Sequence, residues 1–188
     1  MDYRKYRWFL TNSGKLVYGG KSAEQNEAVV NNLINIDENI IVMHTKIPGR
    51  PFAVIDSPIK KINESDLHEA AIWCACFSRA WRTGLKKTIV DIFTSKQISK
   101  NKGMKTGTFA VAGNIEKKVV ELKLYLTKQN GILRTVPEKT LKNKNKELCI
   151  APGKIEKERF AEMISEKLNI KKEEVLNALP TGGFKLCN

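Results

Sequence analysis

Strict alternation of apolar and polar side chains over residues 120–126 most constrains how this chain can fold. The apolar residues are Val120, Leu122, Leu124 and Leu126, and Glu121, Lys123 and Tyr125 lie between them. Successive side chains of a strand point to opposite faces, so a period of two predicts one half-buried strand and excludes a helix. A strand of this kind needs a partner, and residues 131–136 are expected to pair with it.

Short β-rich segments and segments with helical spacing make up the rest of the chain. We expect strands at residues 6–11, 15–19, 40–43, 52–55, 89–93 and 108–112, and helices at 23–34 and 66–82. Ser22 and Gln25 form a capping-box pattern before the first helix, and the pattern turns helical again from Pro152. We therefore predict an α+β fold in which helices pack a mixed or antiparallel sheet. Residues 1–137 would form the main domain and 138–188 a mostly helical C-terminal extension.

Positive charge is concentrated in one part of the sequence. The 188 residues carry a net charge of +13, from 33 Lys and Arg against 20 Asp and Glu. Residues 79–105 hold eight basic residues against one acid, whereas 22–78 hold eight acids against four basic residues. Clustered positive charge favours a polyanionic partner, with nucleic acid first. No apolar run reaches the length of a membrane span and no signal peptide is evident, so we expect a cytoplasmic protein without a membrane partner.

The cysteines and histidines indicate neither a metal site nor a catalytic motif. Cys74 and Cys76 lie two apart in an expected helix and point in different directions, so buried thiols in a reducing compartment are the simpler interpretation. His68 lies in the first turn of that helix, and His44 follows a strand. No nucleophile motif or metal-ligand spacing accompanies either histidine. We predict no catalytic residue, no metal and no cofactor.

Gly20-Lys21-Ser22 resembles part of a phosphate-binding loop but lacks its spacing. The motif G-x-x-x-x-G-K-S/T needs a glycine at position 15, which is Lys15, and Gly14 misses by one residue. A simple turn and helix cap is the preferred interpretation. Backbone N–H groups at a helix start also attract phosphate oxygens, and Lys21 would add charge there.

Basic residues near aromatic residues and glycines form the strongest candidate site. Lysine and arginine neutralise phosphates, and an amide side chain can hydrogen-bond a sugar or a base edge. The predicted nucleic-acid contacts are Lys46, Arg50, Arg79, Arg82, Lys86, Lys87, Lys96, Gln97, Lys100, Lys102 and Lys105. Trp8 and Trp81 could stack on bases, but burial in the core is favoured for both.

Several motifs in order resemble the NFACT-R domain. They are Trp8-Phe9, Leu16-Val17-Tyr18-Gly19-Gly20-Lys21, Gln25-Asn26-Glu27, Met43-His44, Gly49-Arg50-Pro51-Phe52-Ala53-Val54-Ile55, Ala70-Ala71, Ser78-Arg79-Ala80-Trp81, Val90, Gln97-Ile98-Ser99-Lys100, Gly107-Thr108-Phe109 and Gly113. The resemblance covers about residues 5–113 and is closest to a stand-alone archaeal-type member. Within these motifs, the residues assigned to a ligand-binding or structural motif are Gly20, Lys21, Asn26, His44, Gly49, Trp81 and Gly107.

The resemblance implies RNA binding by residues 1–137. Large relatives of this family, the NEMF and RqcH ribosome quality-control factors, bind the obstructed large ribosomal subunit and tRNA. The implied partner here is therefore rRNA or tRNA, and with it the large ribosomal subunit. Short relatives linked to DNA recognition keep DNA as an alternative.

Two other classes of function remain open at this stage. One is an enzyme acting on a nucleotide or RNA, with His44 in a cleft near Asn26 and Gln97. The other is a protein-interaction module whose C-terminal helices, within residues 154–188, dock on a ribosomal or quality-control partner.

Overall fold

Two antiparallel sheets form the framework of the computed structural model, which describes residues 2–45, 52–141 and 147–187. The larger sheet consists of β1 (Arg7–Leu10), β2 (Leu16–Gly19), β3 (Ile40–Thr45), β4 (Ala53–Pro58), β5 (Lys87–Thr94) and β8 (Glu116–Glu121). Its strands are ordered β1-β2-β4-β3-β5-β8. The smaller sheet consists of β9 (Leu124–Gln129), β10 (Ile132–Val136), β11 (Leu148–Ile155) and β12 (Phe184–Leu186), in the order β10-β9-β11-β12. A short pair, β6 (Ile98–Ser99) and β7 (Ala110–Val111), stands apart from both.

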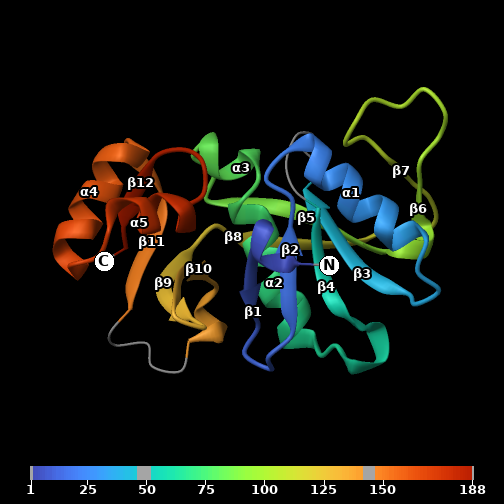
Figure 1. Ribbon diagram of the computed structural model, residues 1–188, viewed down its shortest axis with the longest axis horizontal. Helices are drawn as coiled ribbons and strands as arrows, with labels where there is room; N and C mark the ends of the chain where they lie inside the picture. Colours follow the sequence, from blue (N-terminus) through green and yellow to red (C-terminus); the bar gives the residue numbers. More distant parts are fainter. Residues whose placement is uncertain (1, 46–51, 142–146, 188) are drawn as a thin grey trace.

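Helices pack on this framework. They are α1 (Ala23–Ile34), α2 (Glu64–Cys76), α3 (Arg79–Arg82), α4 (Lys157–Leu168) and α5 (Lys172–Ala178). Single 3-10 turns are η1 (Tyr3–Lys5), η2 (Ile59–Lys61), η3 (Ser95–Gln97) and η4 (Glu138–Thr140). Figure 1 shows α4 and α5 at one end of the molecule and α1 with the β6–β7 loop at the other. The predicted α+β fold is confirmed, and every strand pairing between described residues is antiparallel.

A helix packs on each face of the larger sheet, while Val119 of the edge strand β8 and Ile89 of β5 stay exposed. On one face, a cluster joins α1 to the strands through Val29, Val30, Leu33, Trp8, Tyr18, Val42 and Val54. On the other face, α2 packs on the strands through Ala70, Trp73, Cys74, Phe9, Val17, Met43 and Ile55. Neighbouring strand residues such as Trp8 and Phe9 therefore belong to different cores, as the alternation of side chains in a strand requires.

The core beneath α2 continues without a break into the smaller sheet. Leu124, Ile150 and Phe160 belong to the same cluster as Phe9 and Trp73. The expected boundary after residue 137 falls between β10 and β11, two strands of one sheet. Residues 138–188 contribute α4 and α5 and also β11 and β12, so the extension is less helical than the sequence suggested.

The alternating segment 120–126 is two strands, which corrects the prediction of one. β8 ends at Glu121 in the larger sheet, and β9 begins at Leu124 in the smaller sheet. The alternation continues across the change of sheet because Val120, Leu122 and Leu124 all pack into the same core. The predicted pairing of 131–136 is confirmed, since β10 pairs with β9.

The expected helix 66–82 is interrupted at Ser78. Its hydroxyl donates to the carbonyl of Ala75 at 2.7 Å and accepts from the N–H of Ala80 at 3.1 Å, so it caps α3 after α2 has ended. Ala80 and Trp81 remain buried beyond the break, which explains why the apolar spacing gave no sign of it. Pro152 lies in β11, so the prediction of helix from that residue was also wrong.

Two buried acids of α2 fasten the β1–β2 turn and η4 to the helix. Asp66 accepts from the hydroxyls of Thr11 and Ser13, each at 2.6 Å. Glu69 accepts from the N–H of Asn12 and the hydroxyl of Thr140, each at 2.8 Å. Burial alone would raise the pKa of Asp66, but the hydroxyl and backbone hydrogen bonds hold it below its usual range.

The cysteines fall into two kinds. Cys74 and Cys76 are buried free thiols, and burial raises the pKa of Cys74 to about 12. Cys149 and Cys187 form a disulfide between β11 and the residue that follows β12, a pairing that the sequence did not indicate. Within the described ranges, no helix is both long and apolar enough to traverse a bilayer.

Candidate nucleic-acid interface

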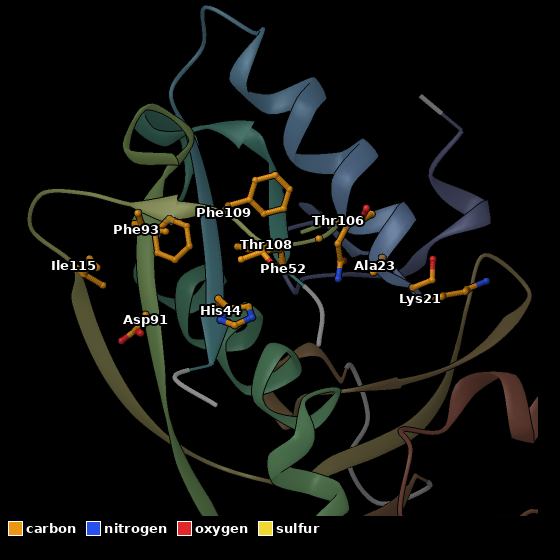
Figure 2. A pocket seen from close by; sticks show the side chains of 15 residues that line it. Lys21, Ala23, His44, Phe52, Asp91, Phe93, Thr106, Thr108, Phe109 and Ile115 are labelled. Carbon is orange, nitrogen blue, oxygen red and sulfur yellow. The ribbon is translucent and has the colours of Figure 1, made fainter. Parts of the chain in front are cut away.

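A cavity of about 680 Å³ lies where the start of α1, β3, β5 and the β6–β7 loop meet (Figure 2). Its lining comprises Gly20, Lys21, Ser22, Ala23, Asn26, His44, Phe52, Asp91, Phe93, Thr106, Gly107, Thr108, Phe109, Val111 and Ile115. Five residues assigned from the sequence to a ligand-binding or structural motif are among them: Gly20, Lys21, Asn26, His44 and Gly107. Residues separated by up to 95 positions thus converge on one site.

Aromatic rings form one wall of the cavity. The Phe52 ring lies 5.4 Å from Phe109 and 6.4 Å from Phe93, in both cases edge to face. The His44 ring lies 4.8 Å from Phe52 with the two planes tilted by 34°. Figure 2 shows these side chains gathered beside Thr108, with Lys21 and Ala23 on the opposite side. Flat apolar surfaces next to a basic rim suit a ring system that carries a negative charge.

Glu27 of α1 holds the β6–β7 loop in place. Its Oε2 accepts from the Nζ of Lys100 at 2.8 Å and from the backbone N–H of Gly107 at 2.6 Å. The hydrogen bond from Lys100, followed by that from Gly107, holds the pKa of Glu27 below its usual range. Lys100 also donates to the carbonyls of Lys105 and Thr108, so all three of its N–H donors are used within the protein.

At two glycines of this site the backbone lies in close contact with residues of α1. A Cβ at Gly20 would lie 2.3 Å from Oδ1 of Asn26. Gly107 has φ +74°, and a Cβ there would lie 3.1 Å from Cα and Cβ of Ala23. Side chains at either position would displace the start of α1, so the two glycines fix the shape of the cavity.

Two polar oxygens of lining residues accept no hydrogen bond from any residue that the structure describes. They are Oδ1 of Asn26 and Oδ1 of Asp91, and both are buried. A buried acceptor without a donor is costly, and such groups are often satisfied by a ligand or by water. Asp91 faces His44 across the β3–β5 register.

Four basic residues meet beside the cavity, and we call them the seam cluster: Lys21, which the sequence motif had indicated, and Arg7, Arg134 and Lys157, which the sequence analysis missed. Arg7 Nη1 donates to the carbonyl of Gly20 at 3.5 Å, and the Arg134 guanidinium lies 4.2 Å from the centre of the Trp8 ring. Burial lowers the pKa of Lys21, and Arg7 and Arg134 lower it further. Burial and then Arg7 lower the pKa of Lys157 in the same way. These residues come from four separate segments, so no local run of charge could have revealed them.

The predicted nucleic-acid contacts divide into exposed and internally bonded residues. Arg79, Arg82, Lys86, Lys87, Lys96, Lys102 and Lys105 are exposed. Lys87 pairs with Glu121 at 3.0 Å, but both side chains are largely in solvent, where such a pair contributes little. In the view of Figure 1, α3 and the β6–β7 loop both lie along the upper edge of the molecule. Lys46, Gly49 and Arg50 lie outside the described residues.

Three residues named in the sequence analysis make hydrogen bonds within the protein. Gln97 accepts from the N–H of Thr94 and donates to the carbonyls of Ala112 and Asn114, so its amide is committed within the protein. Lys100 is committed to Glu27 and to its own loop. Trp81 is fully buried and donates from Nε1 to the carbonyl of Gly183 at 3.1 Å, which agrees with the expectation that it belongs to the core.

Comparison with known proteins identifies relatives for most of this architecture. The family model described as the NFACT protein RNA binding domain matches residues 5–113. The archaeal Rqc2 homolog aRqcH of Methanocaldococcus jannaschii is 31% identical over 197 residues, which cover 98% of this chain and 29% of that protein. The ribosome quality control complex subunit NEMF homolog of Drosophila melanogaster is 30% identical over 118 residues, covering 59% of this chain and 11% of that protein.

A solved structure shares the fold. The C-terminal part of the fibronectin/fibrinogen-binding protein of Streptococcus suis superposes with a TM-score of 0.53 at 22% identity, over 62% of this chain and 44% of that one. The chain spans less than a third of the two curated relatives described above. The archaeal match extends over the smaller sheet, whereas the Drosophila match covers little more than the length of the family model.

Proposed function

The chain belongs to the NFACT protein RNA binding domain family, and from this premise we propose that it binds structured RNA, either rRNA or tRNA, in ribosome-associated quality control. The names of the archaeal and Drosophila relatives support that setting. In this proposal the protein acts in the cytoplasm, without a membrane partner, and the large ribosomal subunit is the assembly that it meets. Residues 1–137 carry most of the RNA contacts, and residues 138–188 add Lys157 of the seam cluster.

One observation carries the proposal. The family motifs Gly20-Lys21, Asn26, His44 and Gly107-Thr108-Phe109 converge on one cavity. The β6–β7 loop that lines it carries exposed lysines, and the seam cluster beside it has an exposed Lys21 and three half-buried cations. The phosphates of RNA would lie on these cations, since phosphate contacts supply most of the affinity and fix the orientation of the bound chain. The proposed interface combines Lys21, Lys96, Lys102 and Lys105 with Arg7, Arg134 and Lys157, and extends to Arg79, Arg82, Lys86 and Lys87.

Binding without catalysis is the proposed activity. The hydroxyl of Ser22, at the cavity, accepts from the N–H of Gln25 and caps α1. His44 stacks on Phe52, and its neighbour across the strands is Asp91. The alternative of an enzyme placed Gln97 in a cleft with His44. The side chain of Gln97 instead accepts a hydrogen bond from the N–H of Thr94, and Gln97 does not line the cavity.

A filter-binding titration with a tRNA transcript tests the proposal. We expect affinity to fall steeply with salt. Changing Lys96, Lys102 and Lys105 together to glutamate should weaken binding by roughly tenfold or more and reduce the salt dependence, because phosphate contacts are lost.

A matched variant controls for the change in net charge. Lys60, Lys61 and Lys171 are exposed and lie outside the proposed interface, so changing them to glutamate alters the charge equally. The proposal fails if the wild-type protein binds neither the tRNA nor a large-subunit rRNA transcript, or if the two triple variants lose affinity to the same extent.

A further inference from the structure

We propose that the cavity at the start of α1 receives one unstacked nucleobase of the bound RNA, and that bases carrying an amino group are preferred over uracil. This inference rests on the proposed RNA binding and adds a specific site to it. The cations described above explain attraction to any polyanion, whereas this cavity would recognise a base.

The size and the walls of the cavity suit a flat heterocycle. Its volume of about 680 Å³ lies in the range of small-molecule sites. Phe52 occupies the centre of the aromatic wall, in contact with His44 on one side and Phe109 on the other. Proteins that bind single-stranded RNA splay out bases and stack them on such side chains, and one stacked base changes Kd by roughly tenfold.

The unpaired oxygens determine which base edge fits. Asn26 and Asp91 line the cavity from α1 and from β5, and Oδ1 of each is buried behind this lining without a donor among the described residues, so a base that reaches them must enter deeply. Both oxygens accept hydrogen bonds, so they favour a base that presents several N–H donors. Guanine, adenine and cytosine carry an amino group, whereas uracil offers a single imino N–H.

The rim of the cavity accommodates the ribose phosphate of the same nucleotide. Lys21 lies at the rim immediately before α1, where backbone N–H groups point outward and the helix dipole favours negative charge. Arg7 bonds the adjacent carbonyl of Gly20, and the Arg134 guanidinium stacks on Trp8 of the same strand as Arg7. A base in the cavity therefore places its phosphate next to the seam cluster.

Nuclear magnetic resonance titrations of the full chain with mononucleotides test the site. The probes are GMP, UMP and ribose 5-phosphate, which share a phosphate and differ in the base. We expect GMP to shift the backbone amides of residues 20–23 and 107–109 and to bind roughly tenfold more tightly than ribose 5-phosphate. UMP should bind more weakly than GMP.

Two variants locate the base contact. Phe109→Ala removes a stacking surface from a half-buried position and should raise the Kd for GMP roughly tenfold. Thr108→Trp places a large side chain from an exposed position of the same loop into the cavity and should abolish GMP binding. Val119→Ala removes an apolar side chain that is 65% exposed on β8, outside the cavity, and should change nothing.

The outcomes separate this inference from the proposed function. If the wild-type protein binds the tRNA transcript but GMP leaves residues 20–23 and 107–109 unshifted, the nucleobase site is wrong and RNA binding stands. The same conclusion follows if Thr108→Trp, confirmed as folded by its amide spectrum, binds GMP like the wild type. If no RNA binds at all, the proposed function itself is wrong.

Discussion

Replacing Gly107 with alanine tests whether the β6–β7 loop depends on close contact with the start of α1. The loop contains a second glycine, Gly103, whose backbone is also left-handed, with φ +88° against +74° at Gly107. A Cβ at Gly103 would have no heavy atom within 4 Å, whereas one at Gly107 would lie 3.1 Å from Cα, Cβ and O of Ala23. The two alanine variants therefore share the free-energy cost of a left-handed backbone, and Gly107→Ala alone adds a steric clash with Ala23.

The expected difference follows from these two contributions. A residue with a Cβ in the left-handed region costs about 1–2 kcal/mol, and this applies to both variants. Both also regain about 0.4–1 kcal/mol from a less flexible unfolded chain. Overpacking against Ala23 adds about 1–3 kcal/mol at Gly107 alone, because the helix backbone there cannot move aside. Gly107→Ala should therefore melt roughly 2–10 °C below Gly103→Ala in a domain of this size.

Thermal unfolding followed by circular dichroism gives the first measurement, and hydrogen exchange gives a local one. The N–H of Gly107 donates to Glu27, so the amide at position 107 should exchange faster in Gly107→Ala and remain protected in Gly103→Ala. Equal melting temperatures together with equal protection in the two variants would show that the loop does not rest on α1 as described.

Three further changes have defined outcomes. Lys100→Met should leave the slope of log tRNA affinity against log salt concentration unchanged, because the ammonium group of Lys100 is committed to Glu27. A slope smaller by about 0.9 in the variant would mean that Lys100 contacts a phosphate. Trp81→Phe should lower the free energy of unfolding in urea by about 0.5–1.5 kcal/mol, since it removes one of the two hydrogen bonds that the carbonyl of Gly183 accepts, the other coming from the N–H of Gly153. It should not alter RNA affinity, and a weaker complex with unchanged stability would place Trp81 in the interface. Asp66→Asn should cost about 1–3 kcal/mol at pH 7. The pKa of Asp66 is lower in the folded than in the unfolded protein. The stabilisation of the fold by the Asp66 carboxylate is therefore present above the unfolded pKa of 3.8 and is lost as pH falls through the folded pKa. A loss of stability in Asp66→Asn that stays constant from pH 7 to pH 2 would contradict this assignment.

Local signals in the sequence predicted much of the fold. The helix at 23–34 was predicted with its observed bounds, because Ser22 caps it and Val29, Val30 and Leu33 form its buried stripe. The strands expected at 6–11 and 15–19 are confirmed as the paired strands β1 and β2. The change of sheet after Glu121 could not be predicted, since β8 and β9 bury the same alternate positions in one core and the period of two continues across both.

The sequence identified several residues of the site but not the contacts that each of them makes. Gly20, Lys21, Asn26, His44 and Gly107 were selected as motif residues, and the structure brings them to one cavity. Lys100 looked like a phosphate contact because its sequence neighbours are basic, yet its partner Glu27 lies 73 positions away. Charge counted along the chain does not reveal such a pairing, and the seam cluster apart from Lys21 was missed for the same reason.

Coverage of both faces of β1 to β4 limits how this fold can meet a nucleic acid. Side chains on these faces of β1 to β4 pack into the two cores against α1 and α2, whereas an open β-surface remains at β8 and the adjoining end of β5, where Val119 is 65% and Ile89 38% exposed. The proposed recognition uses the connections at one rim, chiefly the β2–α1 junction and the β6–β7 loop. A change in the length or composition of these connections can retune which nucleotides are accepted while the interior packing stays as it is, which makes the rim the natural place to engineer new specificity.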